Sequence, residues 1–567
     1  MLRSNPWLLA AVSSVLAACA GSGGDYATGD DSPSSDAGAG TPQCFSSSEC
    51  PVGFTCSEFG TCVPPTPTGD AGVTPPPEVE YKLSEPVNSR RFVWVAMTDQ
   101  DRLAKIDGAN LEVVSLEVGD RPKILATLPG TDTAVVLDSK NGAATVVRAA
   151  TGSIAKELYP TLPNLNRLAV APGGRYAVAF FDLQKAIADA GSLAAVGEIG
   201  SFQDVTVLAV GPGEQRAVDL TVGFRPREVQ SDASGRYAFV VTDDGVSVID
   251  LPAMTAGQAT IVPPIPVTED IFGDASGVEV NVVASGQYAV VRRPGFAGLR
   301  VVSLLGPTAG DAWNLTLPAV PSDIDLAPDG SRVYAVFRDP ARLAVIDIPG
   351  DAIDPTGITT VALTNATSGS LVLSADGKRG LLFTNATLDE RITVVDLDKP
   401  GFPHRTFPLQ KSVLSVGFDP TGTKAIVLHA RKPGDPAQAT SLEDFIDKKP
   451  GYSMFDIATG FSKLQITEVN PSHFTFAPGP AAARAYVTLD GGDAEGAFVA
   501  VQQIELDSGV VRTIELGSPP DSIGVLPESN KIYVSQRHPL GRVSFIDIIT
   551  GQVRTLTGFD LNSQIID

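Results

Sequence analysis

Short apolar runs separated by polar turns recur along most of the chain. Within residues 324–350 an apolar run leads into a turn at Pro328-Asp329-Gly330, and two further apolar runs follow at 333–337 and 343–348. Similar units recur from about residue 90 to the end. A period of about 40–50 residues with four short strands per unit is typical of a β-propeller. The pattern therefore predicts an all-β fold built from four-stranded blades.

Glycine-containing turns mark the first hairpin of most units, because glycine supplies the positive φ that tight hairpins need. Eight such turns, the glycine-free turn Glu528-Ser529 and an opening half-unit at 92–119 give ten units. The glycine-containing turns are Pro129-Gly130, Gly173-Gly174, Ser234-Gly235, Ser285-Gly286, Asp329-Gly330, Asp376-Gly377, Thr421-Gly422 and the weaker Gly479-Pro480. The strand after each turn is apolar nearly throughout, as expected of a strand buried between neighbouring blades. Propellers usually have about four to eight blades. About seven or eight true blades with decorations, or two rings, are therefore alternatives to ten blades.

Two further features concern the ends of strands and the ends of the ring. The third strand of many units ends in an apolar residue and an aspartate, and we expect these aspartates to cap turns. They are Asp107, Asp250, Asp347, Asp396, Asp456 and Asp547. The opening unit lacks a first strand, which residues 560–566 could supply, with 79–84 as the rival segment. Such pairing would close the ring and remove exposed sheet edges.

The N-terminus resembles a targeting signal. Residues 1–18 combine one positive charge with an apolar core, which indicates a signal peptide that is too short to span a membrane. The tetrapeptide Leu16-Ala17-Ala18-Cys19 resembles a bacterial lipobox, and the resemblance implies lipidation of Cys19; an ordinary secretion signal is the alternative. Several acyl chains on one residue would anchor the chain to the membrane. Ala20 favours the outer membrane, so we expect a lipid-anchored protein of the bacterial cell envelope, facing the periplasm or the surface.

Three short segments separate this signal from the propeller, which we assign to residues 81–567. Residues 19–43 are rich in Gly, Ser and Asp and predict a flexible tether, and residues 63–80 are rich in proline and predict a stalk. Between them, residues 44–62 hold Cys44, Cys50, Cys56 and Cys62 at equal spacing. This spacing does not fit a zinc ribbon, and two disulfides are the better interpretation, with three connectivities open.

The repeats resemble the YVTN/YncE-type family of propellers, which overlaps the lactonase-like propellers. The matching phrases are Ala327-Pro328-Asp329-Gly330 with Val333-Tyr334, Ala485-Tyr486-Val487-Thr488-Leu489 and Ile532-Tyr533-Val534-Ser535. The resemblance covers about residues 90–567. It implies the propeller fold and assigns no catalytic residue.

A binding face is predicted where loops joining second and third strands meet the loops between blades. Three long insertions fall there, at 184–200, 263–277 and 432–450, the last with a short helix around 442–446, and loops on a rigid scaffold commonly bind ligands. The same face gathers candidate ligand-binding residues: Arg292, Arg338, His429, Arg431, His473, Arg537 and His538. They could hold an anionic ligand; pairing of the arginines with local acids such as Asp243, Asp339 and Asp490 is the alternative, and a metal held by the three histidines is another. Asp490, Asp493 and Glu495 could take calcium, with a solvated turn as the alternative.

Charge and motifs narrow the function. A net charge of −23 disfavours nucleic-acid binding. Signatures such as G-x-S-x-G, H-E-x-x-H and the P-loop are lacking. The sequence therefore predicts a non-catalytic binding or scaffold module for a protein, glycan or anionic ligand, without a cofactor other than the calcium considered above. A lactonase-like or metal-assisted hydrolase at the channel mouth is the alternative. The sequence does not indicate an oligomeric state.

Overall fold

The computed structural model of the chain describes residues 88–559, except 139, 151–152, 258–259, 270–274, 276 and 478–482, together with residues 55–56, 62–63, 78 and 563–566. The chain divides into two units, Met1–Pro65 and Thr66–Asp567. In the first unit, strand β1 (Thr55–Cys56) pairs antiparallel with β2 (Cys62–Val63), and Cys56 faces Cys62 in the register. Cys19, Cys44, Cys50 and the predicted disulfides lie outside the described residues.

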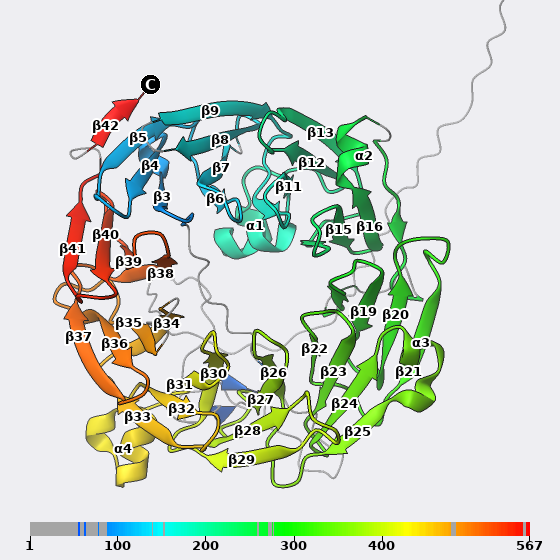
Figure 1. Cartoon of the computed structure of the whole chain (residues 1–567), viewed down its shortest axis with the longest axis vertical. Helices are drawn as coiled ribbons and strands as arrows, with labels where there is room; N and C mark the ends of the chain where they lie inside the picture. The colour runs from blue at the N-terminus through cyan, green and yellow to red at the C-terminus, as the bar shows by residue number, and fades with distance from the viewer. Residues whose placement is uncertain are drawn as a thin grey trace, which may run out of the picture. The chain divides into compact units, whose positions relative to one another are not determined.

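The second unit is a single ring of ten four-stranded sheets (Figure 1). This arrangement confirms the predicted all-β propeller and the count of ten units. The alternatives of seven or eight blades with decorations, or of two rings, are wrong, because each predicted unit forms its own sheet of the ring.

We number the sheets as blades I to X in chain order and give their strands in sheet order. The first five blades are I, β3 (Phe92–Met97), β4 (Arg102–Asp107), β5 (Val113–Glu117) and β42 (Ser563–Ile566); II, β6 (Ile124–Thr127), β7 (Thr133–Asp138), β8 (Ala143–Ala150) and β9 (Ser153–Pro160); III, β10 (Arg167–Val170), β11 (Tyr176–Phe180), β12 (Asp204–Ala209) and β13 (Arg216–Thr221); IV, β14 (Glu228–Ser231), β15 (Tyr237–Thr242), β16 (Gly245–Asp250) and β17 (Pro264–Ile265); and V, β18 (Glu279–Val282), β19 (Tyr288–Arg292), β20 (Gly298–Ser303) and β21 (Ala312–Thr316).

The other five blades follow the same order. They are VI, β22 (Asp323–Leu326), β23 (Arg332–Phe337), β24 (Arg342–Asp347) and β25 (Thr359–Ala362); VII, β26 (Ser370–Leu373), β27 (Arg379–Phe383), β28 (Arg391–Asp396) and β29 (His404–Pro408); VIII, β30 (Val413–Phe418), β31 (Lys424–His429), β32 (Gly451–Asp456) and β33 (Ser462–Ile466); IX, β34 (Asn470–Phe476), β35 (Arg484–Asp490), β36 (Val499–Glu505) and β37 (Val510–Glu515); and X, β38 (Pro520–Leu526), β39 (Lys531–Gln536), β40 (Arg542–Asp547) and β41 (Val553–Thr557).

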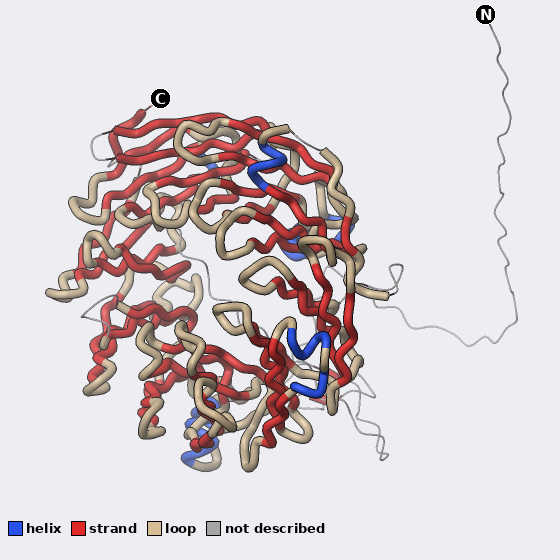
Figure 2. Tube along the Cα trace, turned by 45° about the vertical axis from the view of Figure 1, so that its right-hand side comes forward, coloured by secondary structure: helices blue, strands red, loops and turns tan. Residues whose placement is uncertain are grey.

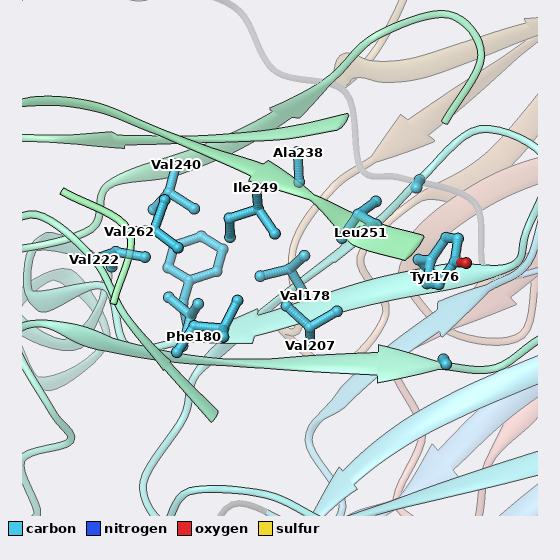
Figure 3. Close-up of a cluster of buried hydrophobic side chains, with 14 residues drawn as sticks. Tyr176, Val178, Phe180, Val207, Val222, Ala238, Val240, Ile249, Leu251 and Val262 are labelled. Atoms are coloured by element: carbon cyan, nitrogen blue, oxygen red, sulfur yellow. The ribbon is translucent and has the colours of Figure 1, made fainter. Parts of the chain in front are cut away.

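The core lies between blades. Every residue of β11 is buried, whereas the outer strand β9 alternates between exposed and covered positions. Figure 3 shows one interblade cluster, in which Val178 and Phe180 of blade III meet Val240 and Ile249 of blade IV. A fully buried side chain of this size stabilises the fold by about 1.5–3 kcal/mol. The apolar middle strands therefore require a neighbouring blade on each side.

The prediction that the aspartates ending the third strands cap turns is confirmed at Asp107, Asp250, Asp456 and Asp547. The side chains of Asp347 and Asp396 form ion pairs instead. Asp547 Oδ1 accepts hydrogen bonds from the backbone N–H groups of Ile549 (3.0 Å) and Thr550 (2.7 Å). The same aspartates also pair with basic residues at the start of the second strand; these ion pairs include Arg91–Asp107, Arg236–Asp250, Arg332–Asp347, Arg379–Asp396 and Lys424–Asp456. Each of these five blades thus has a charged contact between the start of its second strand and the end of its third strand.

The C-terminal strand joins blade I, but not as the first strand. β42 pairs in parallel with β5, so it lies at the outer edge of the sheet. β3 has the register of a second strand, since Phe92 faces Asp107 as Arg332 faces Asp347. The prediction that 560–566 supplies the missing first strand is therefore wrong about its place. The chain leaves blade X through its outermost strand, β41, and continues to the open outer edge of β5, whose backbone groups accept it.

Packing of blade I against blade X closes the ring. Val93 and Ile106 of blade I lie in one buried cluster with Tyr533 and Phe545 of blade X. Lys531 Nζ donates to the backbone oxygen of Gly108 across the same boundary. An isolated antiparallel bridge from Asn88 to Val93 stands where the first strand would be, and the rival segment 79–84 lies outside the described residues.

Helices α1 to α4 of the described residues lie in connections between the strands, and helical segments are blue in Figure 2. α1 (Leu183–Ala190) and α4 (Leu442–Lys448) lie between second and third strands, on the face that also carries the connections between blades. α2 (Leu251–Thr255) and α3 (Gly350–Ile353) lie between third and fourth strands, on the opposite face. The longest predicted helix-bearing insertions thus share one face.

We predict that closure depends on this packing rather than on β42. Phe545→Ala should lower the stability by about 3–5 kcal/mol, because it empties a buried site between blades I and X. Phe239→Ala, at the boundary of blades IV and V, is the matched control and should cost a similar amount. Deletion of residues 563–567 should lower the thermal midpoint much less. A deletion as costly as Phe545→Ala would contradict this assignment.

Candidate functional site

We call the face that carries the interblade connections and the loops between second and third strands the loop-rich face. Its insertions include residues 184–200 with α1, and 432–450 with the 3-10 helix η5 (Pro436–Gln438) and α4. Of the third predicted insertion, 263–277, residues 264–265 belong to β17, and 270–274 and 276 lie outside the described residues. The helix predicted around 442–446 is confirmed by α4. In the view of Figure 1, α1 lies inside the ring of strands, whereas α4 lies at its periphery.

The insertion of blade VIII is held firmly at both ends of α4. Ser441 caps the N-terminus by accepting the N–H of Asp444 at 3.1 Å. Lys411, only 1% exposed, donates from Nζ to the backbone oxygens of Ile446 and Asp447, both at 2.9 Å, so a cation meets the carbonyl end of the helix. Burial lowers the pKa of Lys411 to about 8. Nothing in the sequence marks this lysine, because its partners are backbone atoms far along the chain.

Most candidate arginines are neutralised by local groups. Arg292 Nε donates to Glu279 Oε2 at 2.7 Å, and Arg431 Nε donates to the backbone oxygen of Lys448 at 2.8 Å. Arg225, which lies in the connection between blades III and IV on the same face, pairs with Asp243. At Asp243 the structure therefore shows the alternative to anion binding, in which an arginine pairs with a local acid.

The acidic loop of blade IX binds a cation from blade X. Arg537 Nη2 lies 3.0 Å from Asp490 Oδ2, and its Nε lies 3.0 Å from Asp493 Oδ1. The guanidinium thus binds two of the three carboxylates considered for calcium, while Glu495 is exposed. Across the residues that the structure describes, no three His, Cys, Asp or Glu side chains are grouped so that they could hold a metal ion.

The three candidate histidines have different surroundings. His429 is 4% exposed, and its ring nitrogens lie 3.1 Å from the backbone oxygen of Ser412 and 2.7 Å from Ser453 Oγ. His473 is half-buried on β34, and burial lowers its pKa, although Asp521 and Asp490 oppose this effect. His538 accepts the N–H of Leu540 through Nδ1 at 3.2 Å. His429 therefore belongs to the blade core, and the other two lie near the surface.

Arg338 has a partner that the sequence did not suggest. Its guanidinium binds the carboxylate of Glu78, a residue of the predicted stalk. Thr384 and the backbone N–H groups of Asn385 and Ala386 bind the same carboxylate. No spacing signal could find this group, since about 260 residues separate Glu78 from Arg338.

Two further acids lie close to this region on the inner strand β22. Burial raises the pKa of Asp323 and of Asp325, and the nearby carboxylate of Glu279 raises both further. Asp323 accepts the N–H of Leu371 at 2.9 Å, across the boundary to blade VII. Asp325 Oδ2 is buried and accepts no hydrogen bond from the described residues. These acids destabilise the fold as charged groups, so we expect them to be held partly as neutral acids.

Exposed apolar side chains are frequent on the loop-rich face. Leu442 and Phe445 of α4 are 68% and 38% exposed, and Leu193 of the blade III insertion is 59% exposed. Others on this face are Ile199, Phe224, Val320, Phe498 and Leu540. Large apolar side chains on anchored loops are typical of surfaces that bind macromolecules.

The opposite face holds a hollow of its own. A cavity of about 350 Å³ lies between blades VIII and IX, lined by residues that include Lys424, Asp456, Phe461, Lys463 and Asp507. Lys424 Nζ lies 2.6 Å from Asp456 Oδ2, so its main charges are already paired. The turn between third and fourth strands forms this hollow, and it brings together none of the candidate residues.

Comparisons with known proteins establish no family. No protein-family model matches the chain, and no curated protein matches it significantly. Solved structures similar to it include dihydro-heme d1 dehydrogenase NirN in complex with DHE, at 13% identity over 71% of this chain and 77% of that chain with a TM-score of 0.41. A eukaryotic initiation factor is similar at 11% identity over 76% and 96%, with a TM-score of 0.47. Hydrazine synthase of Kuenenia stuttgartiensis is similar at 14% identity over 72% and 99%, with a TM-score of 0.32. Similarities at this level carry no argument about function.

We predict that His429 makes the stability depend on pH. Burial lowers its pKa from 6.5 to about 4, so between these values the unfolded chain binds a proton that the folded chain does not. Stability should therefore fall by up to about 3 kcal/mol as the pH is lowered through this range. His429→Gln should show a shallower fall of the thermal midpoint between about pH 7 and about pH 4 than the wild type.

The partly exposed His404 supplies the control, and His404→Gln should keep the wild-type slope. Equal slopes for the wild type and His429→Gln would contradict the assignment. Should His429→Gln fail to fold, NMR titration of the wild-type ring can replace it, with a neutral ring expected at about pH 5.

Proposed function

We propose that this chain is a non-catalytic binding propeller whose loop-rich face takes a protein partner, with a glycan or an anionic ligand as the other ligand classes for this face. One observation carries the proposal: apolar side chains are exposed on an insertion that is anchored at both ends. Leu442 and Phe445 point away from the blade core on a helix whose ends are fixed by Ser441 and Lys411. Such pre-organisation lowers the entropy lost on binding.

The cell envelope is the place we propose for this activity. Support comes from the apolar N-terminus, the lipobox-like Leu16-Ala17-Ala18-Cys19 and the cysteine-rich segment that suits an oxidising compartment. The described residues contain no helix with the length and apolar character needed to cross a membrane. The resemblance of the repeats to YVTN/YncE-type propellers is part of this proposal and supports no activity. Calcium binding is not part of this proposal, because Arg537 already binds Asp490 and Asp493.

We predict that substitutions on α4 weaken partner binding. A photo-crosslinking residue at Leu442 of the full chain should yield one discrete adduct in the native cells, and the same residue at Ile549, on the opposite face, should not. Leu442→Asp with Phe445→Asp should weaken the crosslinked partner's binding at least about tenfold, equivalent to about 1.4 kcal/mol.

The matched control is Ile549→Asp with Phe461→Asp, which changes two exposed apolar residues of the opposite face. No adduct from Leu442, or equal adducts from both faces, would overturn the proposal. Turnover of a lactone by the purified chain, lost in Arg537→Met, would support the hydrolase in its place.

Lipidation generates a separate prediction. Cys19→Ala should abolish incorporation of labelled palmitate and release the chain from the membrane fraction, because anchoring requires the acyl chains on this residue. Cys44→Ala is the control, since it removes a cysteine and leaves the lipobox intact. Wild-type chain without label in the membrane fraction would contradict the envelope assignment.

A further inference from the structure

The carboxylate of Glu78 is held on the loop-rich face by four donors from two blades. Oε1 accepts the guanidinium of Arg338, which follows β23, and the hydroxyl of Thr384 at 2.7 Å, which follows β27. Oε2 accepts the backbone N–H groups of Asn385 at 2.8 Å and Ala386 at 3.0 Å. The Glu78 side chain is 8% exposed. Each carboxylate oxygen thus receives two hydrogen bonds, and the bond from Arg338 to Oε1 is also an ion pair.

The pocket is built into the ring. Thr384, Asn385 and Ala386 are all buried, and Asn385 Nδ2 donates to the backbone oxygen of Leu414 in blade VIII at 3.0 Å. Gly369 forms the floor, since a Cβ at this position would overlap Oε1 of Glu78. Its backbone oxygen accepts Ser322 Oγ at 2.7 Å, which fixes it in place. The donors are therefore positioned by the blades and not by Glu78.

Three other blades supply a carboxylate at this point themselves. Asp138 of blade II accepts the N–H of Asn141 at 3.1 Å, and Asp490 of blade IX accepts the N–H of Gly492 at 2.8 Å. Asp182 of blade III accepts the N–H of Lys185 at 3.1 Å. In each case the aspartate at the end of the second strand binds the loop that follows it.

Blade VII lacks such an acid. Its second strand, β27, is followed by Thr384-Asn385-Ala386, so the loop N–H groups are directed at a carboxylate from elsewhere in the chain. The adjacent blade VI supplies the guanidinium of Arg338, much as Arg537 of blade X is supplied to Asp490 of blade IX. The site is therefore complete except for its anion.

We infer that this pocket is a binding site for a glutamate side chain of a peptide, and that Glu78 is its intramolecular occupant. The inference rests on the proposed binding function of the loop-rich face and names the chemistry that one point of that face recognises. A carboxylate fits the four donors and the single cation. A phosphate would bring a third oxygen and a second charge, for which these donors provide no partner. An acidic segment of a partner protein competes with Glu78 for the pocket.

Peptide binding in trans tests the site. The full chain carrying Glu78→Ala should bind a peptide with the sequence of residues 74–82, whereas the wild type should bind it at least about tenfold more weakly, because its own Glu78 competes at high effective concentration. The control peptide, with glutamine in place of glutamate at the position of residue 78, should bind the variant at least about tenfold more weakly than the parent peptide. Glu78→Gln is the second variant if Glu78→Ala does not fold, and the expectations are the same.

The outcomes separate the sources of the carboxylate. Peptide binding that requires its glutamate and is blocked by Glu78 supports the inference. If glucuronate binds Glu78→Ala as tightly as the peptide does, the peptide assignment is overturned, because the pocket would then bind a free sugar acid. Equal peptide binding by the wild type and Glu78→Ala, or none by either variant, overturns the site itself.

Gly369 provides a test that does not depend on a peptide. Gly369→Ala should lower the thermal midpoint of the wild type, because the new methyl group displaces the Glu78 carboxylate, but should cost much less in Glu78→Ala. Gly350→Ala is the matched control, since nothing lies within 4 Å of a Cβ at that position, and its effect should add to that of Glu78→Ala. Additive effects of Gly369→Ala and Glu78→Ala would overturn the assignment of Glu78 to this pocket.

The test is independent of the partner docked on α4. Loss of the Leu442 adduct with intact peptide binding would reject the proposed protein partner and keep the carboxylate site. An intact adduct without peptide binding would do the reverse.

Discussion

Burial of both faces of each sheet is the constraint on which this structure depends. The second and third strands are apolar on both sides, so a blade is stable only between two neighbours. A linear array would leave its first and last blades with one apolar face in water, and closure into a ring removes that cost. The contact of Val93 and Ile106 with Tyr533 and Phe545 is therefore equivalent to the contacts inside the array. β42 only extends the outer edge of a blade that packing has already fixed.

Polar groups fix the turns and loops, which the apolar core does not hold. Aspartates at strand ends hold the turns, and basic side chains such as Lys531 reach backbone oxygens of the next blade. Lys411 does the same for the carbonyl end of α4. The chain is strongly acidic, and its cations are largely engaged by neighbouring acids and carbonyl groups. The loop-rich face is consequently less basic than its arginines alone suggest, and its exposed apolar side chains include two on a helix that is anchored at both ends.

The carboxylate pocket follows from a departure from the repeat. At the end of the second strand, blades II, III and IX carry an aspartate that accepts a backbone N–H of the loop that follows. Blade VII carries Thr384 and Asn385 there, so its loop still offers N–H donors but lacks a carboxylate of its own. Arg338 is distinguished from the other arginines in this way, since its acid comes from outside the blades.

The sequence by itself determined the all-β propeller, its ten units, the second strands and the capping role of Asp547, because alternation of apolar runs and glycine turns is a local property of the chain. It also placed the long insertions and the α4 helix on one face, since strand order fixes the face of each loop. It placed Arg338 among the candidates but could not separate it from Arg292 or Arg537, whose partners lie close in the sheet or in the next blade. Only the tertiary structure decided that His429 is buried, that β42 lies outside β5, and that Glu78 meets Arg338. These outcomes depend on contacts between segments far apart in the chain, where burial and charge are set by neighbours that no local pattern specifies.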